Sequence, residues 1–119
     1  MVRDIVGLMP DKFTIVDEAS DVKSAKESII AHNPELVLLD IDLPDGNAFT
    51  LLEQLANISF KIIFVTAYSE FAVQAFKFSA LDYILKPVVS SELLQALDKV
   101  TKTMELEEIR TKLDTDRKS

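Results

Sequence analysis

Three short aliphatic runs that end in polar residues organise this sequence: LVLLD at Leu36–Asp40, IIFVT at Ile62–Thr66 and LDYILK at Leu81–Lys86. Leu36–Leu39 is an unbroken aliphatic run, which is typical of a strand that is buried on both faces of a parallel sheet. The segments between them, Ala48–Leu55 and Glu70–Phe78, carry apolar residues at helical spacing. Strands that alternate with helices predict an α/β fold, in which helices cover both faces of a parallel sheet.

The same alternation extends toward the amino terminus. Arg3–Met9 has the apolar spacing of a helix, and Phe13–Val16 (FTIV) predicts a short strand. Asp21 can then cap a helix over Val22–Ala31. The repeated order of helix and strand supports a single domain of the α/β class.

A long amphipathic helix is predicted after Ser90, because apolar residues continue at helical spacing past Arg110. Two interpretations remain open for its end. The helix either frays after Leu106 or continues as a helical linker to a following domain or a dimer contact. We expect residues 1–104 to form the domain and residues 105–119 to form a helical linker or disordered tail, with disorder over Thr111–Ser119.

The composition is that of an acidic, cysteine-free globular domain. Its 119 residues suffice for one domain. Its 13 Lys and Arg against 20 Asp and Glu give a net charge of −7, the wrong sign for binding nucleic acid through phosphates. The absence of cysteine excludes thiolate sites, and the single His32 disfavours histidine-rich metal sites. We see neither an apolar run of about 20 residues nor a signal peptide, and therefore expect a cytoplasmic location without membrane contact.

The three aliphatic runs end in a carboxylate, a hydroxyl and an ammonium group, at Asp40, Thr66 and Lys86. In an open parallel sheet, ligands bind beyond the carboxyl ends of the strands, so these side chains are expected to converge. Asp40 can act as a nucleophile, Lys86 can offset phosphoryl charge, and Thr66 can donate a hydrogen bond. The sequence therefore predicts a site for phosphoryl chemistry at this rim.

These residues lie in two longer motifs that carry a family resemblance. LVLLDIDLPDGNAFTLLEQL and KIIFVTAYSEFAVQAFKFSALDYILKP resemble the receiver domain of two-component response regulators. The pattern VTAYSEFAVQAF followed by ALDYILKP is similar to receivers that precede LytTR-type DNA-binding domains. The resemblance implies a flavodoxin-like (CheY-like) fold, a cytoplasmic phosphorelay role in transcription regulation, and no enzymatic turnover. It further implies that a sensor histidine kinase phosphorylates Asp40 to control a C-terminal output domain.

The resemblance also assigns roles around Asp40. It implies that Lys86 pairs with the phosphoryl oxygens and that the Thr66 hydroxyl turns onto them. Tyr83 would be the aromatic switch that swings inward behind Thr66, and Ala67 would leave a path to Asp40. The Lys86-Pro87 peptide bond matches one that is usually cis in the family. Homodimer formation is implied through the helix of Glu70–Phe78, the last strand and the last helix. Direct binding of nucleic acid by this domain is not expected.

One part of the family pattern is missing from this chain. Receivers hold Mg²⁺ with an acidic pair after their first strand, together with the phosphoacceptor, here Asp40, and a main-chain carbonyl, here that of Asp42. Asp17-Glu18 precedes Asp40 by a single strand–helix step, whereas the family's pair precedes it by two. Phe13–Val16 therefore matches the second strand of the family, and the first strand with the remaining acidic ligands is absent. Asp17 and Glu18 are then surface charges, and Mg²⁺ binding is expected to be weak.

The missing strand would lie between Phe13–Val16 and Leu36–Leu39, because the flavodoxin-like strand order is 2-1-3-4-5. Its aliphatic residues would contribute about 6–12 kcal/mol, against a whole-domain stability of about 5–15 kcal/mol. We therefore expect one of three situations. The second strand slides in beside Leu36–Leu39, a neighbouring chain supplies a strand by exchange, or the chain is an N-terminally truncated form of a longer protein.

Two other functions remain open at this point. The first is a receiver-derived interaction or dimerisation module that neither binds Mg²⁺ nor accepts a phosphoryl group. The second, more remote, is a phosphatase similar to haloacid dehalogenases, with Asp40 as nucleophile and Asp42 as general acid or base. Pro44 stands where that enzyme motif carries Thr or Val, which argues against the second alternative.

Overall fold

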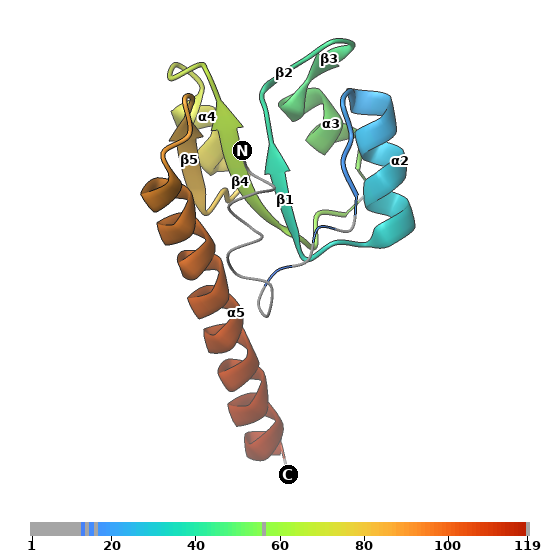
Figure 1. Cartoon of the computed structure of the whole chain (residues 1–119). Helices are drawn as coiled ribbons and strands as arrows, with labels where there is room; N and C mark the ends of the chain where they lie inside the picture. Colours follow the sequence, from blue (N-terminus) through green and yellow to red (C-terminus); the bar gives the residue numbers. More distant parts are fainter. Residues whose placement is uncertain (1–12, 14, 16, 56, 119) are drawn as a thin grey trace.

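The computed structural model describes residues 13, 15, 17–55 and 57–118 (Figure 1). Helices and strands alternate along this part of the chain, as the sequence predicts. In chain order the elements are α2 (Val22–His32), β1 (Leu36–Leu39), β2 (Asp42–Leu43), β3 (Gly46–Asn47), α3 (Ala48–Gln54), β4 (Lys61–Thr66), α4 (Ala72–Lys77), β5 (Asp82–Leu85) and α5 (Ser90–Lys118).

The three predicted aliphatic strands form one parallel sheet in the order β1-β4-β5. β4 lies in the centre, with Leu36 of β1 opposite Lys61 and Asp82 of β5 opposite Ile63. Residues 62–66 of β4 are all buried, since strands cover both of its edges. The parallel α/β fold expected from the sequence is confirmed.

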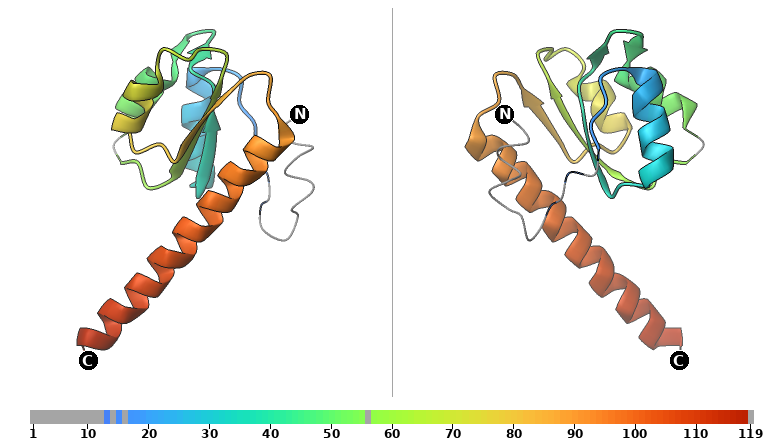
Figure 2. Two further views of the ribbon diagram at one scale, coloured as in Figure 1. Left: turned by 90° about the vertical axis from the view of Figure 1, so that its left-hand side faces the viewer. Right: turned by 45° about the vertical axis from the view of Figure 1, so that its right-hand side comes forward.

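Two hydrophobic clusters pack on the opposite faces of the sheet. One joins Leu39, Ile62 and Phe64 to residues of α2, α3 and α4, with Phe49 at its centre. The other joins Ile63 and its neighbours to α5. Alternate side chains of each strand therefore enter different clusters. This explains why β1 and the middle of β4 consist of apolar residues only. Figure 2 shows α5 crossing one face while α2, α3 and α4 lie on the other side.

The short β2–β3 hairpin follows Asp40 and packs against the start of α2. The carboxylate of Asp45 accepts hydrogen bonds from the amides of Val22 (2.6 Å) and Lys23 (3.2 Å). Gly46 has a φ of 156°, and a Cβ built there would lie 3.2 Å from Cγ2 of Val22, so a side chain would crowd α2. Asp21 adds a capping box with Ser24. The hairpin that follows Asp40 is thus tied to α2.

Helix α5 is longer than the sheet that it covers, and its second half projects beyond the rest of the molecule (Figures 1 and 2). Nζ of Lys61 lies 2.6 Å from Oε1 of Glu107, which joins this helix to the start of β4. Beyond that point Ile109 and Leu113 are more than half exposed. The helix continues to Lys118, so the expected disorder over Thr111–Ser119 is wrong for residues 111–118. The projecting turns are rich in Glu, Leu, Lys and Arg, which have high helix propensity, and this accounts for the difference.

The expected strand at Phe13–Val16 is not formed at its described residues. Phe13 and Ile15 lie outside any strand, and both are half-buried against the cluster under α5. The side chains of these two residues are packed although their backbone belongs to no strand, because β propensity depends on pairing with a neighbouring strand. The predicted helix at Arg3–Met9 lies outside the described residues. None of the described helices is long and apolar enough to cross a membrane.

Candidate functional site

The structure brings Asp40 and Lys86 together at the carboxyl ends of β1 and β5. Nζ of Lys86 lies 2.6 Å from Oδ2 of Asp40, and the two side chains are 48% and 31% exposed, respectively. The amide of Asp42 donates a hydrogen bond of 3.3 Å to Oδ1 of Asp40. The carboxylate therefore has one oxygen held by an ammonium group and the other by a backbone amide, while a third of its surface still faces solvent.

Thr66 ends β4 and lies between these two residues in the sheet order. Its side chain is fully buried, and its Oγ1 accepts a hydrogen bond of 3.4 Å from the amide of Tyr68. The amide of Lys86 donates to the carbonyl of Thr66 at 2.8 Å, so the backbone that carries the ammonium group is fixed to the central strand. The structure therefore brings Asp40, Thr66 and Lys86 together at one edge of the sheet, as the strand ends predict.

Two opposing effects set the charge of Asp40. Burial acts to raise the pKa of its carboxyl group. Hydrogen bonding by the Lys86 ammonium, the Thr66 hydroxyl and the Asp42 amide, together with the positive charge of Lys86, outweighs this and holds the pKa below its ordinary value of 3.8. Asp40 is thus an anion at neutral pH, as a nucleophile toward phosphorus requires.

Tyr83 lies in β5, with its ring packed 6.1 Å from that of Phe64, measured between ring centroids. Its hydroxyl donates a hydrogen bond to the main-chain carbonyl of Tyr68 in the loop between β4 and α4. Burial raises the pKa of Tyr83, and the negative charges of Glu70 and Asp40 raise it further. The hydroxyl is therefore a neutral donor that joins β5 to this loop. Sequence reasoning did not single out Tyr68, since its main-chain oxygen leaves no signal in residue type.

The Lys86-Pro87 peptide bond is cis, as the resemblance implies. Ala67, the small residue beside Thr66, is exposed at the rim. The exposure of Ala67 agrees with an open approach to Asp40 from solvent. Asp42 is exposed and belongs to β2.

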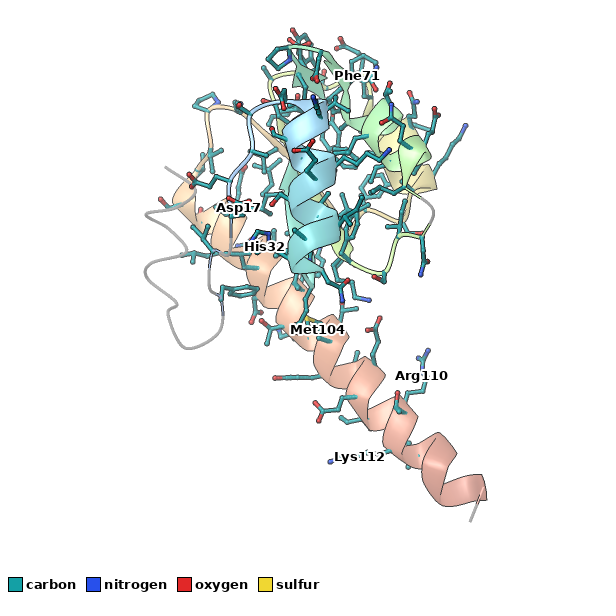
Figure 3. All side chains as sticks on the ribbon, turned by 90° about the vertical axis from the view of Figure 1, so that its right-hand side faces the viewer. Asp17, His32, Phe71, Met104, Arg110 and Lys112 are labelled. Atoms are coloured by element: carbon teal, nitrogen blue, oxygen red, sulfur yellow. The ribbon has the colours of Figure 1, made fainter. Side chains whose placement is uncertain are left out.

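The described residues do not fit a resident magnesium site. Mg²⁺ is bound in proteins through carboxylates and other oxygens in octahedral geometry, and the described part of the chain holds no group of three acidic or histidine side chains. Asp17 accepts a hydrogen bond of 2.6 Å from Ser28 and lies 3.8 Å from His32, both on α2. Hydrogen bonding by Ser28 and the Glu18 amide lowers its pKa. Asp17 and Glu18 are exposed charges, and Figure 3 shows Asp17 and His32 close together beside α2.

The model of the family described as "Response regulator receiver domain" matches residues 2–98 of this chain. Among curated proteins, the chain is 39% identical over 111 residues to the sensory transduction protein LytR of Streptococcus mutans, covering 92% of this chain and 44% of that protein. It is 43% identical over 94 residues to the sensory transduction protein LytT of Bacillus anthracis, covering 74% of this chain and 37% of that protein. The chain thus spans less than half the length of these relatives.

Solved structures agree with the sequence comparisons. The response regulatory domain of protein mrkE from Klebsiella pneumoniae superposes with a TM-score of 0.75 at 28% identity, over 87% of this chain and 88% of that one. The REC domain of AraT, a response regulator from Geobacillus stearothermophilus, superposes with a TM-score of 0.77 at 28% identity, over 90% and 86% of the two chains. The sheet and helices described above are therefore those that these response regulator domains share.

Proposed function

The chain belongs to the response regulator receiver domain family, of the LytR and LytT type, and from this membership we propose that Asp40 is its phosphoacceptor. The observation that carries the proposal is the contact between Asp40 and Lys86 beside the buried Thr66. Its matched relatives are regulators, so the chain is a signalling domain and not an enzyme. This leaves the phosphatase alternative without support.

In the proposed reaction a carboxylate oxygen of Asp40 attacks the phosphorus of a phosphohistidine on a sensor kinase. The new O–P bond forms while the P–N bond breaks, and the imidazole leaves with the electron pair. A small acyl phosphate reacts in the same way, with a carboxylate as the leaving group. The Lys86 ammonium, which already lies 2.6 Å from Asp40, would offset the charge of the transferred group. The product carries roughly −1.5 to −2 charge, if an acyl phosphate behaves like phosphoesters.

We propose that the side chains of Thr66 and Tyr83 change position in response to this added charge. The Thr66 hydroxyl donates to the Asp40 carboxylate while its Oγ1 accepts the Tyr68 amide, so the donated hydrogen bond can pass to a phosphoryl oxygen without loss of the Tyr68 contact. Tyr83 would then turn inward behind Thr66 and give up its bond to the Tyr68 carbonyl. The loop before α4 would lose this contact with β5, which transmits the change to α4.

We propose that this chain binds Mg²⁺ only weakly. Receiver domains generally bind Mg²⁺ at their phosphorylation site. In this chain the carboxylate of Asp40 and the main-chain carbonyl of Asp42 are the ligands that we expect, and the remaining acidic ligands are absent among the described residues. We therefore propose weak binding at most, and no step above is assigned to the metal.

The partners follow from the relatives. We propose a sensor histidine kinase as the phosphoryl donor and a DNA-binding output domain of the LytTR type, in a cytoplasmic protein. Residues 1–104 would be the receiver and residues 105–119 the helical linker toward that output. A homodimer through α4, β5 and α5 is supported by the exposed apolar residues Val73, Phe76, Leu85 and Val89. With its net charge of −7, the domain itself would not contact nucleic acid.

Intact-mass spectrometry after incubation with acetyl phosphate tests the proposal. We expect a gain of one phosphoryl mass in the parent chain and in Asp42→Asn, and no gain in Asp40→Asn. Incubations with and without Mg²⁺ measure the contribution of the metal. A folded parent chain that gains no mass would contradict the proposal. It would support the alternative of an interaction or dimerisation module, which the incomplete set of acidic ligands among the described residues favours.

A further inference from the structure

The projecting half of α5 carries a row of exposed apolar side chains. Leu106, Ile109 and Leu113 are 63%, 54% and 55% exposed, and we call these three residues the α5 stripe. Because each residue turns a helix by about 100°, the three side chains lie within about 60° of one another. Single exposed apolar residues are ordinary on a protein surface. Three that are aligned on one helix face form a patch that another surface can cover.

The α5 stripe faces away from the sheet domain that carries it. The residues of α5 that pack under the sheet include Leu93, Leu97 and Val100, which are completely buried. At about 100° per residue, their mean direction lies roughly half a turn from that of the α5 stripe. Glu107, which binds Lys61 at the start of β4, lies on the same side as these buried residues. A partner can therefore lie along the α5 stripe without meeting the domain.

The spacing of the α5 stripe suits a second helix. Ile109 follows Leu106 by three residues and precedes Leu113 by four, which is the a-d-a spacing of a coiled-coil heptad. An apolar stripe that is limited to these positions is narrower than the face with which a helix covers a sheet. Most helical stability in proteins comes from packing of such a face, and in the projecting turns the α5 stripe is exposed.

The charges beside the α5 stripe favour a second copy of this chain as the partner. Glu105 and Arg110 flank the stripe on opposite sides, at the g and e positions of the heptad. Figure 3 shows Arg110 and Lys112 on the projecting part of the helix. When two copies lie parallel, Glu105 of each faces Arg110 of the other. In the antiparallel order centred on Ile109, the two Arg110 side chains face each other, which is unfavourable.

We propose that the α5 stripe packs against the same stripe of a second copy and forms a short, parallel, two-stranded coiled coil. Leu at the a position with Ile at d also occurs in four-stranded coiled coils, but four strands would bury more of the charged flanks, Glu105 and Lys112. Three apolar side chains from each copy bury less than the roughly 1,600 Å² of a standard interface, so the pairing is reversible. It is independent of phosphorylation and of the proposed contact through α4 and β5.

Sedimentation equilibrium of the whole chain, at concentrations up to about 1 mM, tests the pairing. Val73→Glu is used as the background, because it places a charge on the exposed face of α4 and so weakens a contact through that helix. In this background we expect a dimer, and Ile109→Lys should raise its dissociation constant at least about tenfold, since a charge enters the seam.

Thr111→Lys is the matched control, with the same change in charge on the opposite face of the helix, and should leave the dissociation constant unchanged. A chain that stays monomeric, or equal constants for Ile109→Lys and Thr111→Lys, would overturn the proposal. Assembly of more than two copies would overturn the two-stranded arrangement.

Disulfide trapping tests the direction of the two helices, since the chain has no cysteine of its own. Parallel pairing brings the two thiols of Leu113→Cys together, so in a glutathione buffer we expect at least about tenfold more disulfide-linked dimer than for Thr111→Cys. Antiparallel pairing would instead join Leu106→Cys to Leu113→Cys in a mixture of the two variants. A preference for this mixed disulfide would overturn the parallel arrangement.

A charge exchange tests the ion pairs between the copies. Arg110→Glu is expected to weaken the pairing several-fold at low salt, because two carboxylates then face each other. Adding Glu105→Arg should restore it, since opposite charges again meet in the parallel register. Further weakening by the second substitution would overturn the proposed register.

Discussion

The carboxylate of Asp40 is held by groups from its own segment and from two other strands. Its carboxylate contacts an ammonium group that follows β5 and an amide that follows β1, while the buried hydroxyl of Thr66 lies at the end of the strand between them. None of these residues is unusual alone. Their joint effect is a partly exposed carboxylate that stays ionised despite burial.

Replacing Lys86 should raise the pKa of Asp40. In Lys86→Met the carboxylate loses a hydrogen bond and a positive charge that oppose burial, so its pKa should move up from a value below 3.8. Because the folded-state pKa is lowered, Asp40 stabilises the fold above its ordinary pKa, and this contribution is lost as the pH falls through the folded value. The stability lost between pH 7 and pH 3 should therefore be smaller in the variant.

Titration of the Asp40 carboxyl carbon by NMR measures the first effect, and urea unfolding at the two pH values measures the second. Lys102→Met is the matched control, since Lys102 pairs with Asp98 on the surface of α5 and should leave Asp40 unchanged. An equal pKa in the parent chain and Lys86→Met would show that the ion pair does not govern this site.

The hydroxyl of Tyr83 should stabilise the loop between β4 and α4, and its removal should leave the phosphorylation of Asp40 unchanged. Tyr83→Phe removes the hydrogen bond to the Tyr68 carbonyl but keeps the ring against Phe64. We expect a loss of about 1 kcal/mol or less in unfolding free energy, with faster amide exchange over residues 68–71 and normal phosphorylation of Asp40. A variant with unchanged exchange in this loop would contradict the assigned role of the hydroxyl.

At the scale of elements, the hairpin after Asp40 holds α2 in place. Asp45→Ala removes the carboxylate that accepts the amides of Val22 and Lys23. The expected cost is about 1 kcal/mol in unfolding free energy, as for other N-terminal caps. Denaturant unfolding beside Glu27→Ala, an exposed position on the same helix, measures it. Equal stabilities of the two variants would mean that Asp21 alone caps α2.

The element pattern shows what sequence reasoning could and could not reach. The strands at Leu36–Leu39 and within Lys61–Thr66 were predictable because burial on both faces makes them aliphatic throughout. The site at Asp40, Thr66 and Lys86 was predictable because parallel strands end at one rim. The irregular backbone at Phe13 and Ile15 was not predictable, because β propensity depends on a partner strand and the sequence pattern does not show whether one is present. The bond to Tyr68 was also out of reach, since any residue type offers a carbonyl.

At the scale of the whole molecule, α5 makes the protein more extended in space than a compact chain with the same number of residues. The radius of gyration is 15.2 Å, against about 13.5 Å for a compact chain of this size. The projecting turns account for the excess, and their ties to the sheet end at the exposed pair of Lys61 and Glu107. The molecule is thus a sheet domain with a helical arm.

Removing that arm should leave the domain folded. For a chain that ends at Met104 we expect a loss of at most about 1 kcal/mol in unfolding free energy, the usual contribution of an exposed ion pair, and a radius of gyration near the compact value. Lys61→Met in the full chain isolates the contribution of the ion pair. Small-angle scattering and denaturant unfolding make the comparison, and a shortened chain that fails to fold would place the boundary of the domain beyond Met104.

The central claim is that the acidic residue at the rim receives the phosphoryl group, and locating that group tests it most directly. After incubation with acetyl phosphate, borohydride reduction converts a phosphorylated aspartate to homoserine, which mass spectrometry of the peptides can place. The account predicts homoserine at position 40 and a sharp drop in its yield in Lys86→Met. Homoserine at another aspartate, or none in a folded chain, would contradict the account.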